Sequence, residues 1–196
     1  KRILFICPFP VGVQAGQRLK YEQFFNYFEE NNFEVNVASF INYKTWNIIY
    51  TKGYFLQKTY SLIRGYINRF LLIFKLGEYD IIYIFMWVVP YWGNIFEKVY
   101  LKNAKNSIYD IEDNILVIKK NDVNPLTYLF KNKKKIIHLI ENSDHIIASS
   151  PDLKETCNEI SNNSNKAQYI CASIDLIRYK PTNRYNNDSL VTIGWT

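Results

Sequence analysis

Short apolar runs and longer amphipathic stretches alternate along this chain of 196 residues. The short runs are rich in β-branched residues, as buried strands are, and the longer ones repeat apolar residues every three or four positions, as helices do. Strands are predicted at 2–7, 33–40, 80–86, 107–111, 145–149 and 168–172. Helices are predicted at about 17–31, 54–76, 91–104, 125–142 and 151–161. The alternation predicts an α/β fold, a Rossmann-like, mostly parallel sheet with helices on both faces.

A sheet of this kind carries its functional loops at the carboxyl ends of its strands. In this chain those loops are 8–16, 87–92, 110–114, 149–150 and 172–175. Ser150 is also expected to cap the last helix, with Pro151 at its first helical position. The polar, Asn-rich segment 181–189 is typical of a linker, and 190–194 has the composition of one more strand.

The first loop, in CPFPVGVQAGQRLK, leads from the first strand into the first helix. Gly12 and Gly16 let the backbone approach a ligand closely, and the helix that begins with Gln17 and Arg18 can receive a negative group. A cation in the first turn opposes the helix dipole, so Arg18 makes more sense if it meets an anion. The alternative is a flexible loop with a surface arginine. The glycine spacing is not GxGxxG, so the dinucleotide fingerprint is absent.

The second candidate is the acidic strand end YDIEDN, with Asp110, Glu112 and Asp113. Alternation along a strand places Asp110 and Glu112 on one face. Three carboxylates there could bind a metal, receive sugar hydroxyls or act as a base. The alternative is a solvated acidic turn. The position at a strand end favours a ligand-binding role over metal binding, and no metal is predicted.

The third candidate is the helix 54–76, which contains no acidic residue. One apolar stripe runs along it, formed by Leu56, Tyr60, Ile63, Ile67, Phe70, Leu71 and Phe74. Four basic residues fall outside that arc: Lys58, Arg64, Arg69 and Lys75. The pattern is that of a basic amphipathic helix lying on an anionic bilayer, and these four residues are the predicted membrane contacts. The alternative is that the stripe packs on the sheet.

Charge and cysteine content narrow the function classes further. The chain has 24 basic and 18 acidic residues, a net charge of +6 and a pI near 9.1, which suggests an anionic partner such as nucleic acid, lipid or a nucleotide. Nucleic acid is disfavoured, because the aromatic residues lie on apolar helix faces and strands instead of between basic residues. The three cysteines are widely spaced and predict buried free thiols in a reducing compartment. No window has the ~20 apolar residues of a membrane span.

Five segments in order resemble the N-terminal half of a GT-B glycosyltransferase of the retaining family 4 (group 1). ILFICPFP…GQRLKYEQFFNYFEENNFEVNVASF resembles the family opening, and YDIIYI…P with FEKVYLKNAKNSIYDIEDNI resembles the segment that ends in an acidic strand tip. SDHIIASSPDLKE is similar to the strand-to-helix step AD-x-V-x-x-x-S-x-x-L. ICASIDLIRYKP resembles the stretch before the linker, and VTIGWT resembles the IGWxGS opening of the second domain.

The resemblance implies that residues 1–188 are the acceptor-side domain and that 189–196 begin a donor-binding domain not included here. It implies retention at the anomeric carbon, no essential metal, no cofactor beyond the nucleotide-sugar donor, and little activity of this half alone. Gly12, Gly16, Arg18 and the acidic tip match the family's positions facing donor and acceptor, and Ser149 and Ser150 match its small hydroxyl residues. The family often carries a histidine after the fourth strand, and FMWVVPYW has none, so no catalytic residue is assigned.

The expected function is therefore transfer of a sugar from a nucleotide-sugar to a growing bacterial surface glycan or lipid-linked acceptor. The expected location is the cytoplasm, peripheral to the inner face of the membrane. A non-catalytic α/β module that docks on an anionic membrane or a partner protein is the alternative. A Glu-x7-Glu pattern beyond Thr196 would favour the enzyme.

Overall fold

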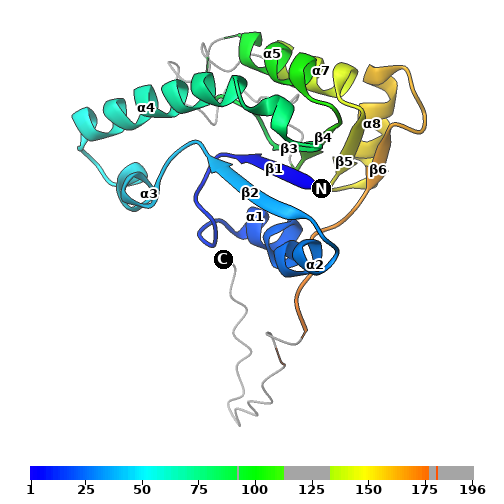
Figure 1. The fold of residues 1–196 in the computed structure, drawn as a ribbon, viewed down its shortest axis with the longest axis horizontal. Coiled ribbons are helices and arrows are strands. Elements are labelled where there is room, and N and C mark those ends of the chain that lie inside the picture. Colours follow the sequence, from blue (N-terminus) through cyan, green and yellow to red (C-terminus); the bar gives the residue numbers. More distant parts are fainter. Residues whose placement is uncertain (92, 113–132, 177–179, 181–196) are drawn as a thin grey trace, which may run out of the picture.

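The computed structural model describes residues 1–91, 93–112, 133–176 and 180. Six strands form one sheet: β1 (Arg2–Cys7), β2 (Glu34–Ser39), β3 (Ile81–Phe85), β4 (Ser107–Ile111), β5 (His145–Ala148) and β6 (Ala167–Tyr169). All neighbouring strands pair in parallel, in the order β2-β1-β3-β4-β5-β6 (Figure 1). The predicted α/β class and Rossmann-like sheet are confirmed, and this sheet is parallel throughout.

Helices cover both faces of the sheet, as predicted. They are α1 (Ala15–Lys20), η1 (Glu22–Phe24), α2 (Phe25–Glu30), α3 (Tyr43–Ile49), α4 (Phe55–Ile73), η2 (Leu76–Glu78), α5 (Ile95–Asn103), α7 (Lys133–Asn142) and α8 (Pro151–Ser161). In Figure 1, α1 and α2 lie on one face, and α4, α5 and α7 lie on the other. Ser150 caps α8 and Pro151 begins it, which confirms that prediction.

Two predictions about the helices differ from the structure. The expected single helix 17–31 is broken at Tyr21, whose ring stacks on Phe5 with centroids 5.1 Å apart, so α1, η1 and α2 follow one another instead. The short helix α3 was not predicted. Residues 125–132 of another predicted helix, the linker 181–189, the strand 190–194 and Asp113 lie outside the described residues.

Apolar side chains form one core on each face, because successive strand residues point to opposite sides of the sheet. In β1, Leu4 and Ile6 join the core under α4, α5, α7 and α8, while Phe5 joins the core against α1 and α2. Cys7 and Cys157 are buried free thiols, as predicted, whereas the predicted burial of Cys171 is wrong, because that cysteine is exposed. Burial on both faces explains why the central strands are apolar almost without interruption.

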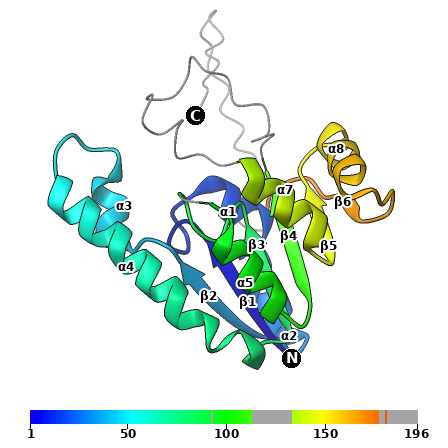
Figure 2. The same ribbon diagram turned by 90° about the horizontal axis from the view of Figure 1, so that it is seen from above.

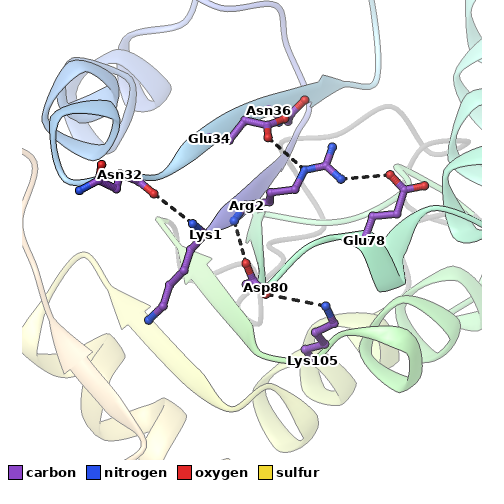
Figure 3. A network of polar contacts seen from close by, with 8 residues as sticks. All are labelled: Lys1, Arg2, Asn32, Glu34, Asn36, Glu78, Asp80 and Lys105. Atoms are coloured by element: carbon purple, nitrogen blue, oxygen red, sulfur yellow. Dashed lines mark hydrogen bonds and ion pairs between the residues drawn. The ribbon is translucent and has the colours of Figure 1, made fainter.

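The amino edge of the sheet carries a surface network of charges (Figure 3). Arg2 pairs with Glu34 at 3.3 Å and with Glu78 at 3.1 Å, and its backbone N–H donates to Asp80. Lys105 lies 3.7 Å from Asp80. Exposed ion pairs of this kind stabilise a fold only slightly. They mark the edge opposite to the carboxyl-end loops and supply control residues for the tests below.

The helix α4 packs with the seven residues of its apolar stripe facing solvent, so the alternative that these residues pack on the sheet is wrong. The adjoining Leu62, Tyr66 and Ile73 pack on the core instead. The seven stripe residues predicted from the sequence are between 52% and 82% exposed. The side that meets the sheet carries Ser61, Gly65 and Arg69, all buried, with Leu62 and Tyr66 at its margin. Gly65 permits close packing, because a Cβ there would lie 2.6 Å from the Phe40 ring.

The prediction that Arg69 contacts a membrane is wrong, because its side chain is buried, with 2% of its area exposed. The guanidinium donates to the carbonyl oxygens of Cys7 at 2.9 Å, Ala38 at 2.8 Å and Val88 at 2.9 Å. These carbonyls belong to β1, β2 and the loop after β3. Burial lowers the pKa of Arg69, and the hydroxyl of Tyr100 donates to its backbone carbonyl. Arg69 therefore ties α4 to three carboxyl-end segments of the sheet.

Replacing Arg69 tests this role. Arg69→Met removes three hydrogen bonds from this guanidinium to main-chain carbonyls and should lower the free energy of unfolding by about 3 kcal/mol, measured by urea denaturation. Arg64→Met, on the exposed side of the same helix, is the matched control and should leave the urea midpoint unchanged. Equal urea midpoints for the two variants would contradict the conclusion that Arg69 holds α4 against the sheet.

Candidate functional site

The predicted binding loops lie at one edge of the sheet, because all six strands run in the same direction. The strand order reverses beside β1, which has β2 on one side and β3 on the other. In open α/β sheets, ligands bind outside the carboxyl ends of the strands at such a reversal. The candidate site is therefore the surface formed by the loops after β1, β3, β4, β5 and β6.

The loop after β1 is held in place by Gln17, whose side chain is fully buried. Its amide accepts from the N–H of Phe9 at 3.1 Å and donates to the carbonyl of Phe9 at 3.0 Å and to Glu22 at 3.0 Å. Glu22 also accepts from the N–H of Gly12 at 2.8 Å. Gln17 therefore positions the loop and is not open to a ligand in this structure, and the alternative of a flexible loop does not fit these bonds.

The two glycines of this loop serve different purposes. Gly12 is exposed with φ of +83°, in the left-handed region that favours glycine, and a Cβ there would meet nothing within 4 Å. Gly16 is buried, and a Cβ there would lie 2.8 Å from the carboxyl carbon of Glu112. Gly12 allows the turn, whereas Gly16 allows the carboxylate at the end of β4 to lie against the start of α1. Arg18 in the same helix is half-buried, and its Nε has no partner in the described part of the chain.

The acidic strand tip is divided between the interior and the surface. Asp110 is fully buried, where it pairs with Lys20 and accepts a hydrogen bond from the hydroxyl of Tyr83. Burial raises the pKa of Asp110, and Lys20 counteracts that effect. The prediction of Asp110 as an open ligand-binding carboxylate therefore needs correction, since its oxygens bind α1 and β3. Glu112 and Asp110 both lie on the α1 face, as the alternation predicted.

The two serines after β5 bind main-chain groups. Ser149 donates its hydroxyl to the carbonyl of Glu112, and the side chain of Ser150 accepts from the N–H of Leu153 at 3.2 Å as the cap of α8. The loop after β6 reaches α1, because the N–H of Ser173 donates to the carbonyl of Leu19 at 3.1 Å. Four of the five predicted loops are thus connected to one another through α1 and Glu112.

The fifth loop, after β3, is held by the helices of the other face. Lys135 donates to the carbonyl of Val89 at 2.7 Å, and buried Glu97 accepts from the N–H of Val89 at 3.4 Å. Burial raises the pKa of Glu97, and the positive charge of Lys135 counteracts this shift. Met86 at the start of the loop has φ of +64°, uncommon for a residue other than glycine. This backbone geometry adjoins the candidate site, because the N–H of Met86 donates to the carbonyl of Asp110 at 3.0 Å.

Sequence reasoning missed the buried partners of the site, above all Lys20, Tyr83 and Lys135. A lysine in an amphipathic helix is normally expected to be solvated. Its role as a buried ion-pair partner becomes visible only when the fold brings a buried carboxylate of a neighbouring strand next to it. No group of three or more His, Cys, Asp or Glu side chains that could hold a metal ion occurs among the described residues. Within that same part of the chain, no helix combines the length and hydropathy that crossing a bilayer requires.

The order and direction of the strands define the fold as a Rossmann-like α/β sheet. No protein-family model and no curated protein matches the chain. Among solved structures it is similar to HepE from Anabaena in complex with UDP-glucose, with 11% identity, a TM-score of 0.48, and coverage of 93% of this chain and 46% of HepE. For the HepE complex with UDP and glucose, identity is 12%, the TM-score is 0.45, and coverage is 93% and 47%. The chain thus spans about half the length of HepE.

The buried pair of Lys20 and Asp110 is open to a direct test. Lys20→Met should lower the free energy of unfolding by about 3 kcal/mol near neutral pH, because it leaves a buried carboxylate without its cation. Without Lys20, the pKa of Asp110 rises further above its unfolded value. The variant should therefore lose stability as pH rises above the unfolded pKa of an aspartate, and the deficit should be smaller near pH 4 than near pH 7.

Unfolding curves at both pH values measure the effect. Lys105→Met, which breaks only the exposed pair with Asp80 (Figure 3), is the matched control and should change little at either pH. A deficit that is the same at both pH values would mean that the variant loses packing only.

The contact between Gly16 and Glu112 predicts that their substitutions are coupled. Gly16→Ala should destabilise the chain because its Cβ displaces the Glu112 carboxylate, whereas the same change in a Glu112→Ala background should cost about 1 kcal/mol less. A double-mutant cycle by urea denaturation measures this coupling. Gly12→Ala, strained by its backbone but free of contacts, should show none with Glu112→Ala. Additive effects at Gly16 and Glu112 would refute the contact.

Proposed function

We propose that this chain is the acceptor-side half of a nucleotide-sugar-dependent glycosyltransferase of GT-B architecture. The observation that carries the proposal is the joining of the loops after β1, β4, β5 and β6 around α1, beside the reversal of strand order. These loops contain the segments whose sequence resembles retaining family 4 enzymes. Both lines of support point to the same edge of the sheet.

The proposed roles follow the chemistry of sugar transfer. The departing nucleoside diphosphate carries negative charge that a fixed cation stabilises, and Arg18, in the last turn of α1 and not in the first turn as the sequence predicted, is the proposed cation. In this proposal, Glu112 and the backbone around Gly12 receive sugar hydroxyls, and Asp113 is a further candidate for that role. Gln17, Asp110, Ser149 and Ser150 act indirectly, as positioning residues, through the loops that they hold. Retention at the anomeric carbon and independence of a metal are part of the proposal.

A complete site in this proposal needs a second domain. Residues 1–188 form the acceptor-side domain, and 189–196 begin the domain that binds most of the nucleotide-sugar. Closure of the two domains would exclude water from the reacting sugar. This chain alone would transfer little or no sugar. The acceptor would be a growing bacterial surface glycan or a lipid-linked sugar, at the inner face of the membrane.

A transfer assay tests the proposal on the protein that includes this chain and the sequence that follows it. A panel of labelled nucleotide-sugars, UDP-glucose among them, is offered with water-soluble acceptors and with lipid extracts. Arg18→Ala should lower kcat/KM about 100-fold, since it removes one charge-stabilising group. Arg2→Ala, at the opposite edge of the sheet (Figure 3), is the matched control and should leave kcat/KM unchanged. Absence of transfer from every donor, or equal rates in the two variants, would reject the proposal.

A second candidate function is a non-catalytic module that docks on an anionic membrane or a partner protein. The exposed apolar side of α4 favours it, since such a surface is uncommon on a protein that stays free in solution. This candidate predicts binding without sugar transfer in the same panel.

A further inference from the structure

The positive charge of this chain is concentrated in one segment. Residues 35–77 contain six basic residues and no acidic one, whereas the remaining residues contain 18 of each sign. The net charge of +6 therefore comes entirely from the segment that includes α3 and α4. Arg69 is the one of the six that is buried, and Lys58 is half-buried with its ammonium on the carbonyl of Thr51 at 2.6 Å. The other four are exposed: Lys44, Lys52, Arg64 and Lys75.

The helix α4 is apolar on two opposite sides, and the described part of the chain covers only one of them. Leu62, Tyr66, Leu72 and Ile73 pack on the core below it. The exposed stripe from Leu56 to Phe74 lies on the other side, and Figure 2 shows α4 along an outer edge of the molecule with α3 at one end. A large exposed apolar surface on a protein usually marks an interaction site for another protein or a membrane. The stripe is therefore expected to have an occupant.

The residues that border the stripe indicate which occupant. At 100° per residue, Gln57, Arg64, Asn68 and Lys75 follow one another along one margin of the stripe. A helix lying in a bilayer interface buries its apolar side among the acyl chains and holds its cations at the level of the headgroups. An anionic surface also attracts the exposed lysines of α3 and of the turn before α4. A protein partner would need acidic residues that match these cations, and no feature of this surface indicates such a partner.

We infer that α3 and α4 form a docking surface for an anionic lipid bilayer. A cavity of about 420 Å³ between the two helices adds a specific contact. Its lining is mostly apolar, with Ile48, Leu56 and Tyr60, but Lys44 and Arg64 also line it. This combination suits a lipid phosphate held by two cations above the start of its acyl chains. None of the predicted binding loops lines this cavity.

The docking surface lies beside the candidate site. The helix α3 and the start of α4 follow the carboxyl end of β2, the edge that also carries the other loops. Docking through them would bring that edge close to the headgroups, where a lipid-linked acceptor presents its sugar. The inference itself rests on charge and exposure only, so it holds whether or not the chain takes part in sugar transfer.

Vesicle co-sedimentation tests the inference with purified chain. Binding is expected to vesicles of phosphatidylcholine with about one-third phosphatidylglycerol, to be much weaker to pure phosphatidylcholine, and to fall as salt is raised. The triple variant Lys44→Glu, Arg64→Glu, Lys75→Glu should reduce the partition coefficient by more than about tenfold. Lys98→Glu, Lys102→Glu and Lys133→Glu make the same change of charge on the exposed surfaces of α5 and α7 and should reduce it much less.

A second variant tests the apolar contribution. Ile63→Ser, Ile67→Ser and Phe70→Ser alter side chains that are 52–54% exposed, so the fold should survive, as checked by circular dichroism, while vesicle binding should be lost. Binding that is insensitive to anionic lipid, or equal for the two charge variants, would overturn the inference. So would self-association of the chain that the serine variant abolishes, because a second copy would then be the occupant. Loss of sugar transfer in the complete protein would leave all of these outcomes unchanged.

Discussion

The hydrogen bonds of one buried guanidinium determine how the long helix sits on the sheet. Arg69 donates to main-chain carbonyls at the ends of β1 and β2 and in the loop after β3, so α4 can take only one rotation about its axis. A charge buried without a carboxylate partner is costly unless its donors are satisfied, and here three carbonyl oxygens satisfy them. That same rotation turns the stripe from Leu56 to Phe74 away from the core.

Much of the fold could be predicted from the sequence, because both the strands and the longer helices carry strong periodic patterns. The strands 2–7 and 107–111 were predicted to the residue, and the others to within a few residues. The rotation of α4 could not be predicted, because a helix that is apolar on two sides gives no periodic signal for which side is buried. The break at Tyr21 and the short helix α3 also depend on tertiary contacts, such as the stacking of Tyr21 on Phe5.

The candidate site was predicted in position but not in detail. Parallel strands bring their carboxyl ends together, so the pattern of strands alone placed Gly12, Glu112 and Ser149 at one edge. Their individual roles depend on partners that no local pattern reveals. Asp110 resembles an open carboxylate in the sequence, and only the fold brings Lys20 and Tyr83 onto it. The loops thereby acquire rigid support, which a binding site needs if its polar groups are to be aligned before a ligand arrives.

The uneven distribution of charge along the chain has a consequence for how the molecule moves before it touches anything. A protein whose charges balance everywhere except in one cationic segment has an electric dipole moment. A dipole rotates in the electric field of a charged surface. Such a field extends about 10 Å from the surface at 0.1 M salt. This protein should therefore be oriented as it diffuses toward a negatively charged surface, with α3 and α4 facing that surface. Encounters in other orientations should be rare.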